Sequence, residues 1–190
     1  MSIWFTSDTH FWHKNIINYT HRPFDPSDVE GMNEAIVEEW NSKVKPNDTI
    51  YHLGDVAFCG VGKINDILSR LNGYKRLVCG NHDRGFLKKE NFTKHWTWIK
   101  PYYRLSGLAG YPTIILFHFP IAAWDEQGRG TWHLHGHSHG SYKAKGKILD
   151  VGLDGPLGFR ILNIDEIRDY MYNIDIHTAD GHAIVREERK

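Results

Sequence analysis

Apolar and polar positions alternate along the first half of the chain in a way that predicts strands joined by helices. Three short apolar runs, each ended by a polar or glycine-containing turn, predict strands at residues 2–6, 49–53 and 76–79. Between them, apolar residues recur at helical spacing over 29–40 and 64–71. Ser27 to Glu30 fits a capping box at the start of the first helix. The resulting β-α-β-α-β order favours parallel strands joined by right-handed crossovers.

The second half of the chain is richer in strands and in glycine-containing turns. Its apolar runs predict four more strands, at residues 113–118, 131–135, 147–151 and 159–164. Helical spacing returns only at 167–174, and 181–186 has the pattern of an additional edge strand. Two β-rich halves joined in this way predict an α/β fold, a four-layer α-β-β-α sandwich of two mixed sheets flanked by helices.

Composition narrows the class of protein. A length of 190 residues favours a single domain covering 1–190. An apolar fraction of 41% and seven tryptophans exclude a disordered chain. The 23 Lys and Arg residues balance 23 Asp and Glu residues, which argues against strong binding of long nucleic acid or of anionic membranes. The sequence indicates no signal peptide, membrane span or disulfide, so we expect a cytoplasmic protein in which Cys59 and Cys79 are small buried hydrophobic groups.

Histidine is the unusual residue, with 13 in the chain. Six of them lie at or just after the ends of predicted strands, with two aspartates and an asparagine beside them. In open α/β sheets, ligands collect outside the carboxyl ends of the strands, so we expect these side chains to meet. The histidines are His10, His82, His118, His135, His137 and His139, and the neighbours are Asp8, Asp55 and Asn81.

Five short motifs containing these residues follow one another in a fixed order. They are Asp8-Thr9-His10, Gly54-Asp55, Gly80-Asn81-His82-Asp83, the strand-end His118, and Gly136-His137-Ser138-His139. In this order they resemble the calcineurin-like metallophosphoesterase superfamily, over about three quarters of the chain. The run from Ile3 to Phe11, continued by His13, Asn15 and residues 21–24, looks like a small single-domain branch found in bacteria and bacteriophages.

The resemblance implies two adjacent metal sites. The first ion would be held by Asp8, His10 and His139, the second by Asn81, His118 and His137, and both would be bridged by Asp55. A bridging carboxylate offsets the repulsion between two dications. Mixed imidazole and oxygen ligands suit Mn²⁺, Fe, Ni²⁺ or Zn²⁺ better than Mg²⁺ or Ca²⁺, and we favour Mn²⁺. A hydroxide shared by the two ions would attack the phosphorus atom directly.

Residues near the ions have the chemistry for further roles. By resemblance, His82 would donate a proton to the leaving group, with Asp55 as the other catalytic residue. Asn15 can hydrogen-bond the attacking water or a phosphate oxygen, and Arg22 offers a bidentate fork to phosphate. Support of the ligands, rather than direct ligation, is expected for the two remaining histidines of the cluster, His133 and His135.

The chain departs from the motif of family members that dephosphorylate serine and threonine residues of proteins. Those members extend Gly-Asp to Gly-Asp-x-x-Asp-Arg-Gly, whereas Phe58 and Cys59 stand at the second Asp and the Arg here. The acid that would orient the catalytic histidine and a phosphate-binding arginine are therefore missing, which weakens the protein-phosphatase interpretation. Asp83 is a candidate substitute for the orienting acid.

We therefore expect a dinuclear metal-dependent phosphoesterase acting on a small phosphate ester, a nucleotide being one candidate. Few arginines are assignable to the site, which leans toward diesters over dianionic monoesters. The alternative is a non-catalytic scaffold like the trafficking subunit of the retromer, although that adaptor has lost the histidine that stands here as His82. A site of the metallo-β-lactamase type is disfavoured because its His-x-His-x-Asp-His motif requires an acid at Ser138 or Gly136.

Overall fold

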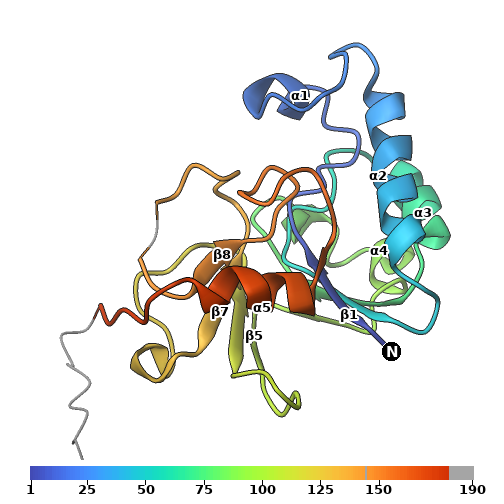
Figure 1. Ribbon diagram of the computed structural model, residues 1–190. Coiled ribbons are helices and arrows are strands. Elements are labelled where there is room, and N and C mark those ends of the chain that lie inside the picture. The colour runs from blue at the N-terminus through green and yellow to red at the C-terminus, as the bar shows by residue number, and fades with distance from the viewer. Residues whose placement is uncertain (144, 180–190) are drawn as a thin grey trace, which may run out of the picture.

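The computed structural model describes residues 1–143 and 145–179 and contains two sheets packed against each other (Figure 1). The predicted edge strand at 181–186 lies outside the described residues. The first sheet has five strands in the order β4-β3-β2-β1-β9. They are β1 (Ile3–Thr6), β2 (Thr49–His52), β3 (Tyr74–Val78), β4 (Trp98–Lys100) and β9 (Leu162–Asn163). Strands β1 to β4 are parallel, and β9 runs antiparallel to β1.

The second sheet has four strands in the order β5-β6-β7-β8. They are β5 (Tyr102–Leu105), β6 (Ile114–Phe117), β7 (Trp132–His135) and β8 (Ile148–Asp150). Strands β6, β7 and β8 are parallel, and β5 runs antiparallel to β6. Both sheets are therefore mixed.

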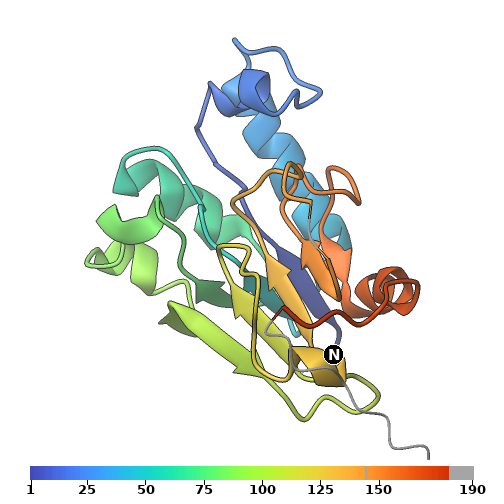
Figure 2. The ribbon, with the colours of Figure 1, turned by 90° about the vertical axis from the view of Figure 1, so that its left-hand side faces the viewer.

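Helices cover the first sheet and close one side of the molecule. The helices α2 (Val29–Lys43), α3 (Val61–Arg70) and α4 (Glu90–Thr93) share a core with the face of the first sheet that is turned away from the second. Helix α5 (Ile164–Tyr172) follows β9 and lies at the edge of both sheets, as Figure 2 shows. The short elements α1 (Ile16–Tyr19), η1 (Asp83–Gly85) and η2 (Gln127–Arg129) interrupt loops. The predicted fold class, two mixed sheets flanked by helices, is confirmed.

Side chains of the strands alternate between two cores. On β2, Ile50 packs among the helices, whereas Tyr51 lies between the two sheets. Leu116 of β6 and Leu134 of β7 enter the same inter-sheet core from the opposite side. All four side chains are almost completely buried. Burial of each aliphatic side chain stabilises the fold by about 1.5–3 kcal/mol, and the packing of Tyr51, Leu116 and Leu134 holds the two sheets in one fixed relation.

The start of α2 differs by one residue from the prediction. Asp28 is the N-cap, and its side chain accepts a hydrogen bond from the Gly31 N–H at 2.8 Å. Ser27 donates its hydroxyl to Asp25 instead, so the capping box predicted from Ser27 is wrong. An aspartate at this position both satisfies a free backbone N–H and complements the positive end of the helix dipole.

Loops at the carboxyl ends of the parallel strands are joined to one another. After β1, the Asp8 N–H donates to the Gly54 carbonyl of the loop after β2, at 2.9 Å. In the second sheet, the Gly136 N–H donates to the His118 carbonyl, also at 2.9 Å. An isolated parallel bridge between Ser7 and Gly152 connects the loops of the two sheets. The strand ends that carry the sequence motifs therefore meet at one edge of the molecule.

Candidate metal centre

Three side chains from the loops after β1 and β7 form a first group of candidate metal ligands. One ligand atom from each of Asp8, His10 and His139 lies within 4.8 Å of the others. Asp8 and His10 are buried, and His10 Nε2 is 3.7 Å from Asp8 Oδ1. Because β1 and β7 belong to different sheets, this group exists only when the two sheets are packed together.

A second group adjoins the first. Ligand atoms of Asp55, His118 and His137 also lie within 4.8 Å of one another. His118 Nε2 is 3.4 Å from Asp55 Oδ2 and 3.1 Å from Asn81 Oδ1, so the asparagine amide joins this group. Asp55 Oδ2 is also 3.9 Å from His10 Nε2 of the first group. The carboxylate of Asp55 therefore lies between the two groups.

Two buried polar atoms of the first group have no hydrogen-bond partner among the described residues. They are Asp8 Oδ1 and His10 Nε2. A buried carboxylate oxygen and imidazole nitrogen without partners are costly to the fold unless something binds to them. Both atoms are electron-pair donors, and the surrounding carboxylates and imidazoles are the ligand types that divalent first-row metals prefer. The residues present therefore fit a metal ion.

Electrostatic contacts within the centre favour charged carboxylates. Burial opposes ionisation of Asp8, but contact with His10 and the positive charge of His118 outweigh it and hold the Asp8 pKa below its usual range. Burial also opposes ionisation of Asp55, and contact with His118 outweighs it and lowers the Asp55 pKa. In His118, burial is overcome by the Asp55 and Asp8 carboxylates, which raise its pKa to about 8. The carboxylates thus keep the centre attractive to cations.

The backbone of the candidate ligands is strained. Five non-glycine ligands have φ in the left-handed region, with values of 54° at Asp8, 48° at His10, 58° at Asp55, 65° at His137 and 46° at His139. Few non-glycine residues adopt this conformation, and those that do cluster at functional sites whose surroundings enforce it. At Asp8 and His10, hydrogen bonds from the N–H groups to the carbonyl groups of Gly54 and Asp55 hold the backbone in this conformation.

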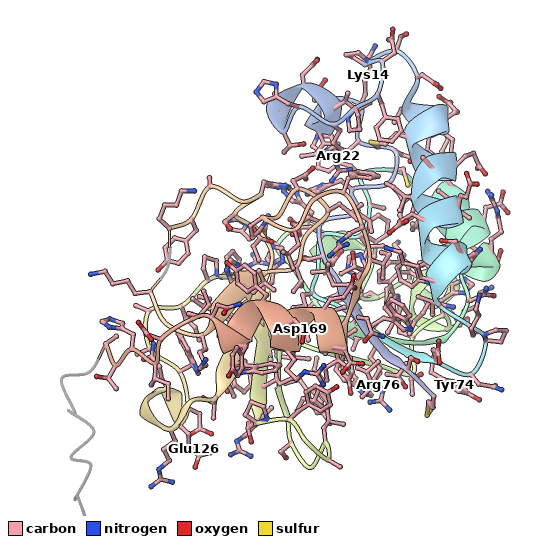
Figure 3. All side chains as sticks on the ribbon, in the orientation of Figure 1. Lys14, Arg22, Tyr74, Arg76, Glu126 and Asp169 are labelled. Atoms are coloured by element: carbon pink, nitrogen blue, oxygen red, sulfur yellow. The ribbon has the colours of Figure 1, made fainter. Side chains whose placement is uncertain are left out.

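Arg22 is buried inside the protein. Its guanidinium donates to both carboxylate oxygens of Asp154, at 2.9 Å each, and to the backbone carbonyl groups of Asp8 and Thr9. Figure 3 shows Arg22 within the molecule beneath α1, whereas the exposed Lys14 lies at the outer surface. Since these contacts occupy the guanidinium, the prediction that Arg22 offers a fork to phosphate is wrong. Asp154 is 132 residues away from Arg22 in the chain, so the sequence pattern does not reveal that the two side chains pair.

Asp154 contacts a candidate ligand and was not predicted from the sequence. Its Oδ2 atom lies 2.8 Å from His139 Nδ1, so the carboxylate accepts the N–H of this imidazole. The hydrogen bond fixes the ring so that Nε2 is the nitrogen free to bind metal. Arg22, Asp154 and His139 thus form one chain of contacts behind the first group. The only sequence signal was an acid beside glycine, shortly after a strand.

Asp83 supports the loop of Asp55 and does not contact the His82 ring. Its carboxylate accepts the N–H groups of Asp55, Val56 and Gly80 at 3.0, 2.9 and 2.8 Å. The suggestion that Asp83 replaces the orienting acid is therefore wrong. The His82 backbone N–H donates to Asp55 Oδ1 at 2.9 Å, and its ring, 42% exposed, meets the Phe58 ring edge-on at 5.4 Å.

Histidines of β7 face away from the ligands. Leu134 enters the inter-sheet core, so the side chains before and after it lie on the opposite face of the sheet. His133 Nδ1 donates to the Ile115 carbonyl at 3.1 Å on that face. His135 Nδ1 donates to the Gly136 carbonyl of the ligand loop at 2.8 Å. Asp150 also supports this loop, since its carboxylate accepts the Ser138 hydroxyl at 2.7 Å.

Two further residues near the centre lie on the loop before α1. Asn15 was predicted to contact substrate, whereas the sequence assigned no role to His13. His13 Nδ1 is 3.4 Å from His10 Nδ1, and its ring stacks on Phe58 with centroids 4.5 Å apart. Burial and the neighbouring imidazoles lower the His13 pKa to about 4. Asn15 is exposed at the N-cap of α1, and its contact with substrate stays a prediction.

Several known proteins are similar to this chain in sequence or in fold. The sequence profile of the family described as calcineurin-like phosphoesterase matches residues 1–190. An uncharacterized protein of Methanocaldococcus jannaschii is 35% identical over 74% of this chain and 70% of its own. The gene 66 protein of Mycobacterium phage L5 is 28% identical, over 94% of this chain and 97% of its own. The crystal structure of a protein of unknown function from Aquifex aeolicus matches with a TM-score of 0.68 and 25% identity, covering 89% of this chain and 98% of that one.

The fold, the two groups of ligands and these similarities define a metal-dependent phosphoesterase, a hydrolase of phosphate esters that uses divalent ions. The chain belongs to the calcineurin-like phosphoesterase family, as its five motifs predict, and its phage and archaeal relatives fit the small single-domain branch. The scaffold alternative is not supported. Over residues 1–143 and 145–179, no helix combines the length and apolar character that crossing a membrane requires.

Proposed function

We propose that the protein hydrolyses small phosphate esters at two divalent metal ions. Asp8, His10 and His139 would hold one ion, Asn81, His118 and His137 would hold the other, and Asp55 would contribute to both. The position of the Asp55 carboxylate carries this proposal. Its Oδ2 lies 3.9 Å from His10 Nε2 in the first group and 3.4 Å from His118 Nε2 in the second.

When bound, the ions would lower the pKa of the attacking water and place positive charge beside the phosphoryl oxygens. The mixed nitrogen and oxygen ligands support Mn²⁺, Fe, Ni²⁺ or Zn²⁺, and among these we favour Mn²⁺. The chain itself contributes preorganisation. Asp154 fixes the His139 imidazole and Asp83 fixes the Asp55 loop, so the ligands are oriented before the substrate arrives.

His82 is the proposed general acid. Its backbone is anchored to Asp55 while its ring remains exposed on the open side of the centre. The imidazole can therefore donate a proton to the alcohol oxygen that leaves phosphorus. Asn15, exposed at the start of α1, is proposed to hydrogen-bond a phosphate oxygen.

Diesters are the favoured substrates. A dianionic monoester needs more positive charge from its site than a monoanionic diester, and the guanidinium of Arg22 is already paired with Asp154. Two cavities adjoin the candidate residues, one of about 380 Å³ at His82 and one of about 770 Å³ at His137 and His139. Separate cavities give room for the two substituents of a diester.

Turnover after metal reconstitution tests the proposal. The chelator-treated protein is loaded with Mn²⁺, Ni²⁺, Fe²⁺ or Zn²⁺ and offered bis-p-nitrophenyl phosphate, p-nitrophenyl phosphate and a panel of cyclic nucleotides. We expect faster release of nitrophenol from the diester than from the monoester, with the highest rate in Mn²⁺. Absence of turnover of every ester with all four metals would overturn the proposed function.

A further inference from the structure

A cavity of about 380 Å³ opens beside His82, next to the candidate metal centre. We call it the Phe58 cavity. Its apolar wall comes from Phe58, Cys59, Val61 and Phe86, while His82 forms the side that faces the centre. A mostly apolar hollow beside a strongly polar site has a volume near the lower end of the roughly 300–1,000 Å³ typical of small-molecule pockets.

Phe58 is exposed but held in place. The residue is 52% exposed to solvent, so a large apolar surface lies open beside the polar centre. Its ring stacks on His13 with centroids 4.5 Å apart and meets the His82 ring edge-on at 5.4 Å. Its backbone N–H donates to the Phe11 carbonyl at 2.8 Å. The ring is therefore preorganised as one face of the cavity and leaves its other apolar surface free.

The position of His82 identifies which part of a substrate enters. His82 is the proposed donor of a proton to the departing oxygen, and the same ring lines the cavity. The group attached to that oxygen therefore extends into the cavity, whereas the group that stays on phosphorus lies elsewhere. This step rests on the proposed function.

We propose that the Phe58 cavity binds the leaving alcohol and selects phosphate esters whose leaving alcohol carries an aromatic ring. A flat ring fits beside Phe58 and Phe86, because offset and edge-on contacts between aromatic rings add to the free energy of apolar burial. An aliphatic alcohol of one or two carbons leaves most of the cavity to water. The proposed selectivity concerns which alcohol leaves. It can therefore be measured with one diester that carries two different alcohol groups, as the ratio of the two alcohols released.

Methyl 2-phenylethyl phosphate makes that choice measurable. The attacking water displaces either 2-phenylethanol or methanol, the P–O bond to the departing oxygen breaks, and His82 protonates that oxygen. The two alcohols are similarly acidic, so their intrinsic leaving ability is nearly equal. We expect the metal-loaded protein to release 2-phenylethanol over methanol by about tenfold, as burial of one aromatic ring predicts.

Two variants remove the cavity in different ways. Phe58→Ala deletes its aromatic wall. Gly85→Leu fills it, since a Cβ at Gly85 has no heavy atom within 4 Å and the substitution needs no backbone change. In both we expect the ratio of the two alcohols to approach one. The matched control is Gly62→Leu, at an exposed glycine of α3 with equal free space, and it should keep the wild-type ratio.

A binding measurement separates this inference from the proposed function. Calorimetry compares 3-phenylpropylphosphonate with propylphosphonate on the metal-loaded protein, and neither can be hydrolysed. We expect about tenfold tighter binding of the aromatic compound, lost in Phe58→Ala and Gly85→Leu and kept in Gly62→Leu and Tyr19→Ala. Tyr19 is an exposed aromatic residue of the other cavity.

The outcomes are distinct. If neither alcohol is released, the proposed function fails. The phosphonate measurement then tests by itself whether the Phe58 cavity binds an aromatic group. If alcohol is released without preference, or if the preference survives both cavity variants, the cavity inference is wrong while the proposed function stands. Loss of aromatic binding in Tyr19→Ala, with no loss in Phe58→Ala, would also overturn it.

Discussion

His82 combines an anchored backbone with an exposed ring. Its N–H donates to Asp55 Oδ1 at 2.9 Å, whereas the imidazole faces the open side of the centre. Alanine keeps the backbone hydrogen bond and removes the ring. We therefore expect His82→Ala to lower kcat by about 10²–10⁴-fold, the usual contribution of one general acid, with unchanged metal content by elemental analysis. If metal and activity were lost together, His82 would instead be a residue that orients a ligand.

Asp154 links the buried Arg22 to the His139 imidazole. Asp154→Asn keeps the size of the side chain but removes the charge that makes the ring a better metal ligand. We expect metal affinity to fall by about 10–100-fold, as for other carboxylates behind ligand histidines, with activity recovered at high metal concentration. Calorimetric metal titration measures the change. Asp169→Asn, on the exposed surface of α5 in Figure 3, is the control that should bind metal normally.

Individual residues differ in how far the sequence reveals them. The candidate ligands can be predicted because each stands in a short motif at a strand end, and parallel strands bring such ends together. Asp154 escapes prediction because its role depends on one hydrogen bond to a distant loop. Arg22 is misassigned because the same charge can face a substrate or pair with an acid inside the protein. Burial decides between these, and burial is a property of the tertiary fold.

Strands interrupted by charged residues or proline are harder to predict than strands that stand in clear apolar runs. The seven predicted strands follow clear apolar runs, and the structure contains each of them within a few residues of its predicted bounds. Strands β4 and β5 are missed because residues 98–105 form no clear apolar run: Lys100, Pro101 and Arg104 interrupt it. Strands as short as β8 and β9 stand within longer apolar runs and are predicted. The neighbouring strands β3 and β6 supply the hydrogen bonds that create β4 and β5.

Gly136 allows the end of β7 to pass close to the end of β1. A Cβ at this residue would lie 2.0 Å from Ser7 Oγ and 2.2 Å from Asp8 Oδ2. Gly136→Ala must therefore displace the Asp8 carboxylate from His10 and His139. We expect metal affinity to fall by about tenfold or more, because ligand geometry tolerates only small errors. Competition with a chromogenic chelator measures the affinity.

Gly62→Ala is the matched control for that substitution. Nothing lies within 4 Å of the added Cβ, and the residue is exposed on α3. Because Gly62 lies in the first turn of α3, alanine should raise the free energy of unfolding by less than the roughly 1 kcal/mol typical of helix interiors and leave metal affinity unchanged. Unaltered affinity in Gly136→Ala would mean that the two loops can separate without moving Asp8.

The molecule as a whole has no net formal charge, yet its charges are unevenly distributed. Two carboxylates stand among histidines at the junction of the sheets, and two bound dications would add about four positive charges there. A neutral chain can thus present a cleft that attracts phosphate. The first ligand group also draws on both sheets, so the inter-sheet core and the metal centre depend on each other.

Histidines buried away from the centre should make the stability of the whole molecule depend on pH. Burial lowers the pKa of His133 from 6.5 to about 3. Its Nδ1 donates to the Ile115 carbonyl and its Nε2 accepts the Ile121 N–H, a pattern that suits the neutral ring. Because the pKa is lower in the folded state, the unfolded chain takes up the proton first. The stabilising contribution is present above pH 6.5 and is lost as the pH falls from 6.5 towards 3.

Between pH 6.5 and pH 5, this loss amounts to about 1.5 kcal/mol for one such histidine. Urea unfolding of the metal-free wild-type protein and of His133→Asn at both pH values measures it. Comparing the two proteins cancels the titration of the ligand histidines, which both retain. The wild type should lose about 1.5 kcal/mol more than the variant over this interval. Equal losses of stability in the two proteins would mean that folding does not lower the pKa of His133. That result would contradict a neutral, buried His133 ring.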